Sequence, residues 1–226
     1  MKIDRRKNYY LTIDTETANT SKENGFNYPL VYDIGGCIHD KKGNVYETFS
    51  FIIYETFCGM KDLMQTAYYA KKIPNYENEI KDGTRTIVKY ATAKKTINEL
   101  CKKYNVKAVI AHNARFDYRA TTTTQRYLTK SKYRYFLPYG IPLWDTLKMA
   151  QDTICKQVHY KEWCYLNGYL TKNGRVRATA EILYRYISGD NQFIEDHTGL
   201  EDVLIEKEIF AHCMRQHKPM RKECFA

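Results

Sequence analysis

The sequence predicts an α/β protein in which a mixed sheet starts as an antiparallel meander, continues with parallel strands and is flanked by helices. Three observations support this fold class. β-rich runs separated by turn residues fill the start of the chain, apolar residues at helical spacing follow them, and short apolar runs then alternate with helical stretches. The switch from one period to the other, without an internal repeat, indicates strands and helices within a single layered structure.

The antiparallel part of the sheet is predicted from the first β-rich runs. Residues 9–14 form the first strand, and residues 30–40 and 45–54 form the next two. The turn KKGN between the last two runs contains a glycine and is short enough for a hairpin loop. These runs therefore predict a meander of three strands.

Helices and parallel strands are predicted in the rest of the chain from hydrophobic spacing. Two further short apolar strands cover 106–112 and 141–145, with a helix between them. The other helices are expected at residues 60–70, 92–105, 146–158, 176–189 and 197–216. The turn-rich segment NGYLTKNGR connects two of these helices, so this half of the chain alternates helix with strand and ends in helices.

The composition is that of a globular protein. Of 226 residues, 43% are hydrophobic and 27% are charged, and we expect one domain over residues 1–226. No apolar run is long enough to cross a bilayer, and the basic N-terminus lacks the apolar segment of a secretory signal, so we expect a cytoplasmic protein without membrane association. The seven cysteines show neither C-x-x-C nor zinc-ligand spacing, which predicts reduced thiols.

The charge balance favours a polyanionic partner. Lys and Arg number 36 against 26 Asp and Glu, a net charge of +10. Such an excess attracts nucleic acid and steers it in at salt-dependent rates. The 21 tyrosines supply flat rings on which unpaired bases can stack, although codon bias explains such a composition equally well.

Asp14 and Glu16 follow an apolar strand in the stretch YLTIDTETANT. Side chains at positions i and i+2 of a strand point to the same face, so the two carboxylates repel each other. Magnesium or manganese between them cancels that repulsion, because hard cations prefer oxygen ligands. Hydration at a solvent-exposed strand end is the alternative, and this spacing by itself favours it.

Acids recur beside histidines in two later segments. In AHNARFDYR, His112 and Asn113 follow a buried strand, and Asp117 lies four residues after Asn113 on the same helical face. In DHTGLEDVLIEKEIF, His197 precedes Asp202 by five residues across the start of a helix. Taken singly, each acid could be a solvated helix residue and the histidine a loop or capping residue.

Together, these motifs resemble the DEDDh branch of the DnaQ-like 3′-to-5′ exonucleases. IDTET resembles the first exonuclease motif, AHNARFD the second and HTGLED the third, in the family's order. The hairpin DIGGCIHDKKGN and the segment LWDTLKMA add to the resemblance, which runs from about Tyr9 to about Cys213. It implies a ribonuclease H-like, five-stranded mixed sheet with helices on its faces.

The resemblance also implies a metal-dependent nuclease that removes 5′-mononucleotides from the 3′ end of single-stranded DNA or RNA. Two divalent cations, Mg²⁺ or Mn²⁺, would be the cofactors. Asp14 would bridge both ions, Glu16 and Asp202 would complete the first site, and Asp117 would support the second. His197 would accept the proton of the attacking water. The catalytic residues implied are therefore His197, Asp14, Glu16, Asp117 and Asp202.

Substrate contacts are expected from three residues of the same motifs, Thr15, Asn113 and Phe116. For Asn113 the alternative is a structural role in the turn after its strand. Asp145 is expected to be a helix N-cap. The family usually has alanine where this chain has Gly199, a difference that removes no ligand.

Two segments, about 56–90 and 160–178, are insertions relative to the family pattern, and substrate preference is expected to depend on them. Single-stranded nucleic acid is the expected partner, with DNA slightly favoured over RNA. A polymerase or another protein is a further candidate partner, and the sequence leaves the oligomeric state open. The alternative function is a catalytically silent nucleic-acid-binding module with the same fold.

Overall fold

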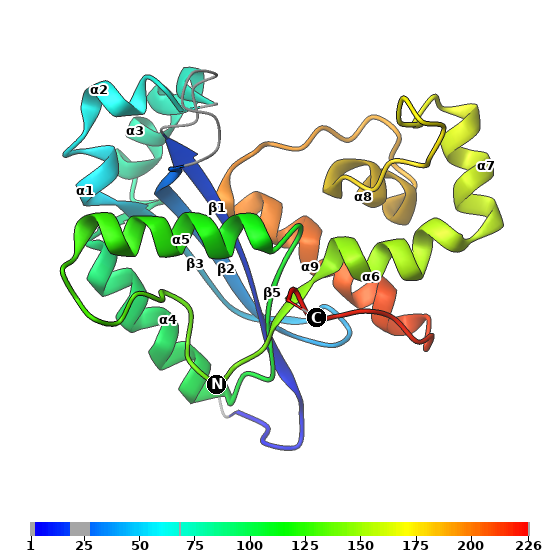
Figure 1. Cartoon of the computed structure of the whole chain (residues 1–226), viewed down its shortest axis with the longest axis horizontal. Coiled ribbons are helices and arrows are strands. Elements are labelled where there is room, and N and C mark those ends of the chain that lie inside the picture. Colours follow the sequence, from blue (N-terminus) through cyan, green and yellow to red (C-terminus); the bar gives the residue numbers. More distant parts are fainter. Residues whose placement is uncertain (1–2, 19–27, 68, 226) are drawn as a thin grey trace.

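The computed structural model describes residues 3–18, 28–67 and 69–225 (Figure 1). Within these ranges, six strands form the sheet: β1 (Tyr9–Ala18), β2 (Leu30–Asp40), β3 (Val45–Ile53), β4 (Thr86–Val88), β5 (Val109–Ala111) and β6 (Leu143–Asp145). Their order across the sheet is β4-β3-β2-β1-β5-β6. The neighbours among β1, β2 and β3 are antiparallel, whereas β4, β5 and β6 each run parallel to a neighbour.

The helices of the same residues are α1 (Tyr54–Phe57), α2 (Lys61–Met64), α3 (Ile73–Lys81), α4 (Tyr90–Tyr104), α5 (Arg115–Leu128), α6 (Thr146–Asp152), α7 (Val158–Leu166), α8 (Ala180–Ser188) and α9 (Gly199–Arg215). Two short 3₁₀ turns, η2 (Ala70–Lys72) and η3 (Ile154–Lys156), lie between them. No helix in the described ranges combines the length and the apolar composition that a membrane span requires.

This arrangement confirms the predicted fold class, a mixed sheet that starts as a meander and continues with parallel strands between helices. The sheet has one strand more than expected. The additional strand β4 comes from the first insertion and pairs parallel with the end of β3, from Phe51 to Ile53. Three residues of mostly exposed chain carry too little hydrophobic pattern to predict a strand.

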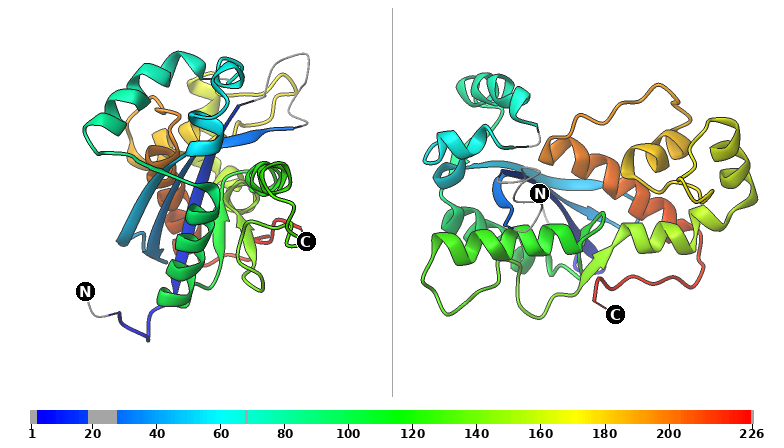
Figure 2. Two further views of the ribbon diagram at one scale, coloured as in Figure 1. Left: turned by 90° about the vertical axis from the view of Figure 1, so that its left-hand side faces the viewer. Right: turned by 45° about the horizontal axis from the view of Figure 1, so that its top comes forward.

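Strand β1 is central and is covered on both faces (Figure 2). Leu11 and Ile13 pack with residues of α4 and α5 on one face, whereas Tyr10 packs with residues of α6, α8 and α9 on the other. Fully burying an aliphatic side chain of this size contributes about 1.5–3 kcal/mol. The two alternating faces therefore fix the register of β1 and the direction in which each later side chain points.

The expected helix over residues 60–70 is wrong, because the chain there divides into α2 and η2 before α3 begins. Pro74 lies in the first turn of α3, where its fixed φ favours a helix start. The insertion around 160–178 contains most of α7 and a tight turn closed by the Leu170–Val176 bridge. In Figure 1 the first insertion lies beside the end of β1, whereas the second, with α7, lies on the opposite side of the molecule beyond α8.

Candidate active site

Asp14 and Glu16 lie beyond the part of β1 that β5 covers. Strand β5 pairs with β1 only at Leu11 and Thr12, after which the chain turns away into α5. The next two even-numbered side chains of β1 are therefore half-buried at an open edge of the sheet. As the alternation predicts, both carboxylates point to one face, and their oxygens lie within 4.8 Å of one another and of an oxygen of Asp202.

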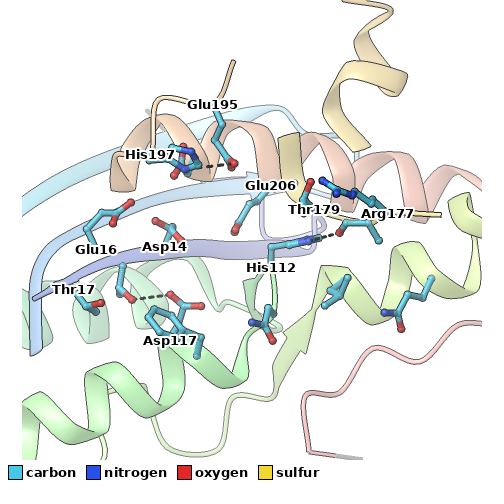
Figure 3. Close-up of a pocket in the computed structure, with 18 of the residues that line it drawn as sticks. Asp14, Glu16, Thr17, His112, Asp117, Arg177, Thr179, Glu195, His197 and Glu206 are labelled. Atoms are coloured by element: carbon cyan, nitrogen blue, oxygen red, sulfur yellow. Dashed lines mark hydrogen bonds and ion pairs between the residues drawn. The ribbon is translucent and has the colours of Figure 1, made fainter. Parts of the chain in front are cut away.

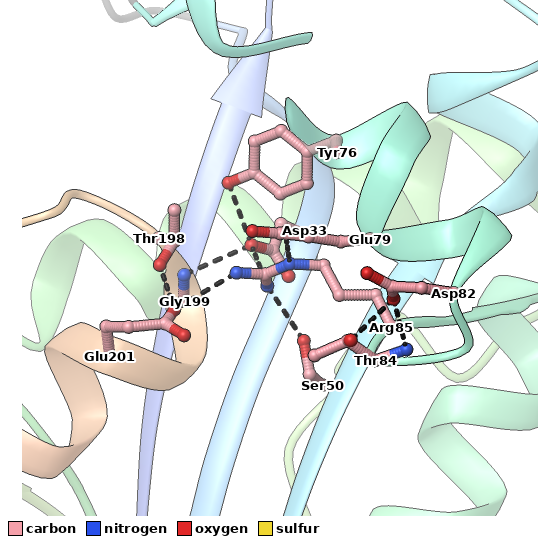
Figure 4. Close-up of polar contacts among 10 residues, drawn as sticks. All are labelled: Asp33, Ser50, Tyr76, Glu79, Asp82, Thr84, Arg85, Thr198, Gly199 and Glu201. Atoms are coloured by element: carbon pink, nitrogen blue, oxygen red, sulfur yellow. Dashed lines mark hydrogen bonds and ion pairs between the residues drawn. The ribbon is translucent and has the colours of Figure 1, made fainter. Parts of the chain in front are cut away.

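Asp202 is placed by an unusually close contact between α9 and β2. Gly35 and Gly199 bring the two backbones together: a Cβ atom on Gly35 would lie 2.0 Å from the Gly199 carbonyl carbon. The Asp33 carboxylate of β2 also accepts a hydrogen bond from the Gly199 N–H (3.1 Å), which satisfies an N–H at the start of α9 (Figure 4). Asp202 follows in the first turn of this anchored helix.

A buried arginine from the first insertion completes that anchor. Arg85 donates to Asp33 (3.1 Å) and to Ser50 (2.8 Å) through one nitrogen, and to Glu201 (3.0 Å) through another. The Tyr76 hydroxyl donates to the same Asp33 oxygen, 3.0 Å away. The start of α9 is thus attached to β2 and to the first insertion through one network (Figure 4).

Asp117 reaches the site from the other face of the sheet. It lies in the first turn of α5, is almost fully buried, and accepts a hydrogen bond from the Thr15 hydroxyl (2.8 Å). The turn that starts α5 depends on Asn113, whose φ of 60° is left-handed and whose N–H donates to Asp145. The Asp145 side chain also caps α6 by accepting from the Leu147 N–H, as expected for an N-cap.

His197 lies on the wall of the same cleft, just before α9. Its φ of 51° is in the left-handed region, which is uncommon for a residue other than glycine. Its ring stacks on Tyr69 with 4.5 Å between ring centroids, and its Nδ1 lies 3.6 Å from an oxygen of Glu195. The imidazole is thus oriented by groups that the three sequence motifs do not contain.

The carboxylates of the cleft repel one another. Burial, reinforced by neighbouring carboxylates, raises the pKa of Asp14 and that of Glu16 well above the usual range. Burial also raises the pKa of Asp117 to about 7 and that of Asp202 to about 8. Among the described residues, none of the ion pairs involves any of these acids.

The donor set fits a divalent cation. Asp14, Glu16 and Asp202 offer oxygens at mutual distances suited to one ion. One oxygen of Asp202 and one of Glu206 are buried without a hydrogen-bond partner, which is costly unless a ligand of opposite charge binds there. Oxygens grouped in this way are of the kind that a divalent cation binds.

The cleft has a volume of about 910 Å³ and extends from the acids to the second insertion (Figure 3). His112 links the wall near the acids to the second insertion. Its Nε2 donates to the Ala178 carbonyl (2.8 Å), and its Nδ1 lies 2.9 Å from the Thr146 hydroxyl. The lining includes the expected Thr15, Asn113 and Phe116. It also includes residues that the sequence motifs did not indicate, Tyr69, Arg175, Arg177, Thr179, Glu195 and Glu206.

The fold can be compared with solved structures. The chain shares its fold with 3′-exonucleases of known structure. The sequence matches no protein-family model and none of the curated proteins.

Several solved structures that resemble this chain are exonucleases. One is a 3′-exonuclease that recognises the 3′ end of a histone mRNA stem-loop, with a TM-score of 0.59, 11% identity, and coverage of 96% of this chain and 85% of that one. Another is the nuclease domain of 3′hExo, a DEDDh family member bound to rAMP, with a TM-score of 0.54, 12% identity, and coverage of 97% and 98%. A third is Exonuclease I from Methylocaldum szegediense, with a TM-score of 0.54, 17% identity, and coverage of 94% and 41%.

Proposed function

We propose that this protein is a metal-dependent 3′-to-5′ exonuclease that hydrolyses single-stranded DNA or RNA and releases 5′-mononucleotides. The observation that carries the proposal is the convergence of four acids from three separate segments in one cleft, with His197 on its wall. Asp14 and Glu16 come from β1, Asp117 from α5 and Asp202 from α9. The fold shared with known 3′-exonucleases supports it.

Two divalent cations, Mg²⁺ or Mn²⁺, are the proposed cofactors. Asp14, Glu16 and Asp202 would hold one ion, and Asp14 and Asp117 would hold the other. When bound, such a pair activates water and stabilises the leaving oxygen in phosphodiester hydrolysis. The Thr15 hydroxyl fixes the orientation of the Asp117 carboxylate through their hydrogen bond.

His197 is the proposed general base. Partial burial and the nearby Lys72 lower the pKa of His197, which favours the neutral imidazole that a base requires. Nδ1 is the nitrogen beside Glu195, so Nε2 is the atom proposed to accept a proton from water. Glu195 then lies where it stabilises the imidazolium that results.

The strand is proposed to enter between the acids and the second insertion. Thr15, Asn113 and Phe116 would contact the terminal nucleotide, since they line the cleft around Asp117. Arg175 and Arg177, both exposed, lie farther along the same cleft, where guanidinium groups would bind backbone phosphates. The net charge of +10 would attract such a negatively charged strand from a distance.

Digestion of a 5′-labelled single-stranded oligonucleotide tests the proposal. With Mg²⁺ or Mn²⁺ the protein is expected to shorten the strand one nucleotide at a time, and Asp14→Ala is expected to abolish shortening. Asp62→Ala, which removes an exposed acid from α2, is the matched control and should remain active. Equal degradation by wild type and Asp14→Ala would reject the assignment. Matched DNA and RNA strands, measured side by side, decide which is preferred.

A further inference from the structure

Glu206 lies one helical turn after Asp202 on α9, so both side chains are on the same face of that helix. Glu206 is only 3% exposed, one of its oxygens has no hydrogen-bond partner, and it lines the cleft. We propose that Glu206 is a fifth metal-binding carboxylate, which joins Asp117 and Asp14 in holding the second divalent cation. The proposal rests on the proposed function, because it extends the same metal site.

The position of Glu206 assigns it to the second ion. Figure 3 shows Glu16 on one side of Asp14 and Glu206 on the other. Glu16 and Asp202 lie together with Asp14 in one group of oxygens. Glu206 is on the side toward His112, away from Glu16, and lines the cleft together with Asp117.

No ion pair among the described residues gives Glu206 a compensating positive charge. Carboxylates dominate its surroundings: besides burial, Asp117, Asp202 and Glu195 raise its pKa, and Asp14 interacts with it as well, whereas the His112 backbone N–H lowers its pKa. A buried carboxylate with an unpartnered oxygen costs free energy unless a cation binds it. The next residue shows the contrast: Lys207 is almost as buried as Glu206, but it pairs with Glu208.

Calorimetric titration with Mn²⁺ tests the proposal on wild type, Glu206→Gln and Glu208→Gln. Glutamine keeps the shape of Glu206 and removes its charge, so the affinity for one ion is expected to fall by about tenfold or more. Glu208→Gln removes the same charge from the same helix, outside the cleft, and should bind as wild type does. Unchanged Mn²⁺ binding by Glu206→Gln overturns the proposal.

Thermal unfolding without metal separates a ligand from a structural residue. If Glu206 is a ligand, Glu206→Gln melts no lower than wild type, because the change removes repulsion, and Mn²⁺ raises its melting temperature less. A lower metal-free melting temperature with a normal Mn²⁺ shift means a structural role and rejects the proposal. If the glutamine variant fails to fold, Glu206→Asp, which retracts the carboxylate, replaces it in both measurements.

The oligonucleotide assay keeps this inference distinct from the proposed function. Loss of one Mn²⁺ site in Glu206→Gln, in a protein without nuclease activity, would support the metal ligand and reject the enzyme. Nuclease activity with full Mn²⁺ binding by Glu206→Gln would support the enzyme and reject the fifth ligand.

Discussion

Two groups of carboxylates lie beside the start of α9, and they differ in whether a positively charged side chain pairs with them. Asp33 is completely buried, and its Oδ2 accepts hydrogen bonds from Arg85, Tyr76 and the Gly199 N–H, while its Oδ1 has no partner (Figure 4). The acids of the cleft face mainly one another (Figure 3). Oxygens of Asp202 and Glu206 also lack partners, and no ion pair of the described residues supplies either acid with a cation.

The difference indicates which carboxylates serve the fold. A carboxylate that holds two elements together receives its counter-charge from the chain, as Asp33 does from Arg85. A carboxylate whose counter-charge must come from solution is left without a cation, and burial together with neighbouring carboxylates raises its pKa. Burial raises the pKa of Asp33 too, but there Arg85 acts in the opposite direction. The two groups should therefore respond in opposite ways when a charge is removed or a cation is added.

The largest expected effect comes from removing Arg85, the cation that pairs with Asp33. Arg85→Met leaves Asp33 buried without its cation, and removing one partner of a buried pair costs about 3–5 kcal/mol. At roughly 2–4 °C per kcal/mol, the melting temperature should fall by roughly 10 °C. Differential scanning calorimetry of both proteins, with and without Mn²⁺, measures this change.

Two controls accompany this measurement. Arg221→Met breaks an exposed ion pair with Asp152 and is expected to cost no more than about 1 kcal/mol. Adding Asp33→Asn to Arg85→Met removes the orphaned charge and should restore part of the loss. An Arg85→Met protein as stable as Arg221→Met would show that the Asp33 network does not anchor α9.

The next effect concerns His197, the residue between the cleft acids and the Asp33 network. His197 precedes the anchored Gly199 by two residues, so its removal should affect chemistry and leave the anchor intact. His197→Ala is expected to lower the turnover rate by about 10²-fold or more, as for loss of a general base. Its melting temperature and Mn²⁺ affinity should stay near those of wild type.

His159→Ala is the control for that measurement, since His159 is exposed on α7. Single-turnover digestion of an oligonucleotide gives the rate for each protein. Wild-type turnover by His197→Ala would remove His197 from the mechanism while leaving the four acids as candidates.

The last effect is a dependence of stability on pH, which comes from the carboxylates of the cleft. Burial raises the pKa of Asp117 to about 7 and that of Asp202 to about 8, so between about pH 5 and 8 the folded state binds more protons than the unfolded state. Stability of the metal-free protein should therefore fall as pH rises through this window, by on the order of 2–4 °C for each kcal/mol lost.

Saturating Mn²⁺ should oppose this fall, because the ion binds ionised carboxylates. Asp117→Asn should weaken the pH dependence, since it removes one of the groups with a raised pKa. Melting curves across the window measure both effects. A metal-free melting temperature that rises from pH 5 to pH 8 would contradict the repulsion between these acids.

The elements predicted correctly are those with a strong local pattern. The second and third strands, α4 and α9 show clear periodicity or turn signals, and their observed bounds are close to the expected ones. The first strand is expected to end at residue 14, but β1 continues to Ala18 because its polar end still pairs with β2. The strand β4 and the break between α2 and α3 depend on pairing and packing with distant residues, which a local pattern does not encode. Propensity was overridden there by tertiary contacts.

The residues of the site also differ in whether a local sequence signal predicts them. The motif spacing indicated Asp14, Glu16 and Asp202, and the structure brings these three together. Glu206 also had a local signal, an acid one turn after Asp202 on a buried face, which the motif comparison did not use. Arg85 had none, because its partners Asp33 and Glu201 lie 52 and 116 residues away in the sequence.

The contact between Gly35 and Gly199 has a consequence for how such a sequence can diverge. When a side chain in a packed core changes size, a neighbouring side chain can change in the opposite sense and restore the fit. A side chain at Gly35 would meet the backbone of Gly199 and Leu200, and no substitution removes backbone. At most positions a second substitution can therefore compensate for a first one. At the contact between β2 and the helix that carries Asp202, no second substitution can do so.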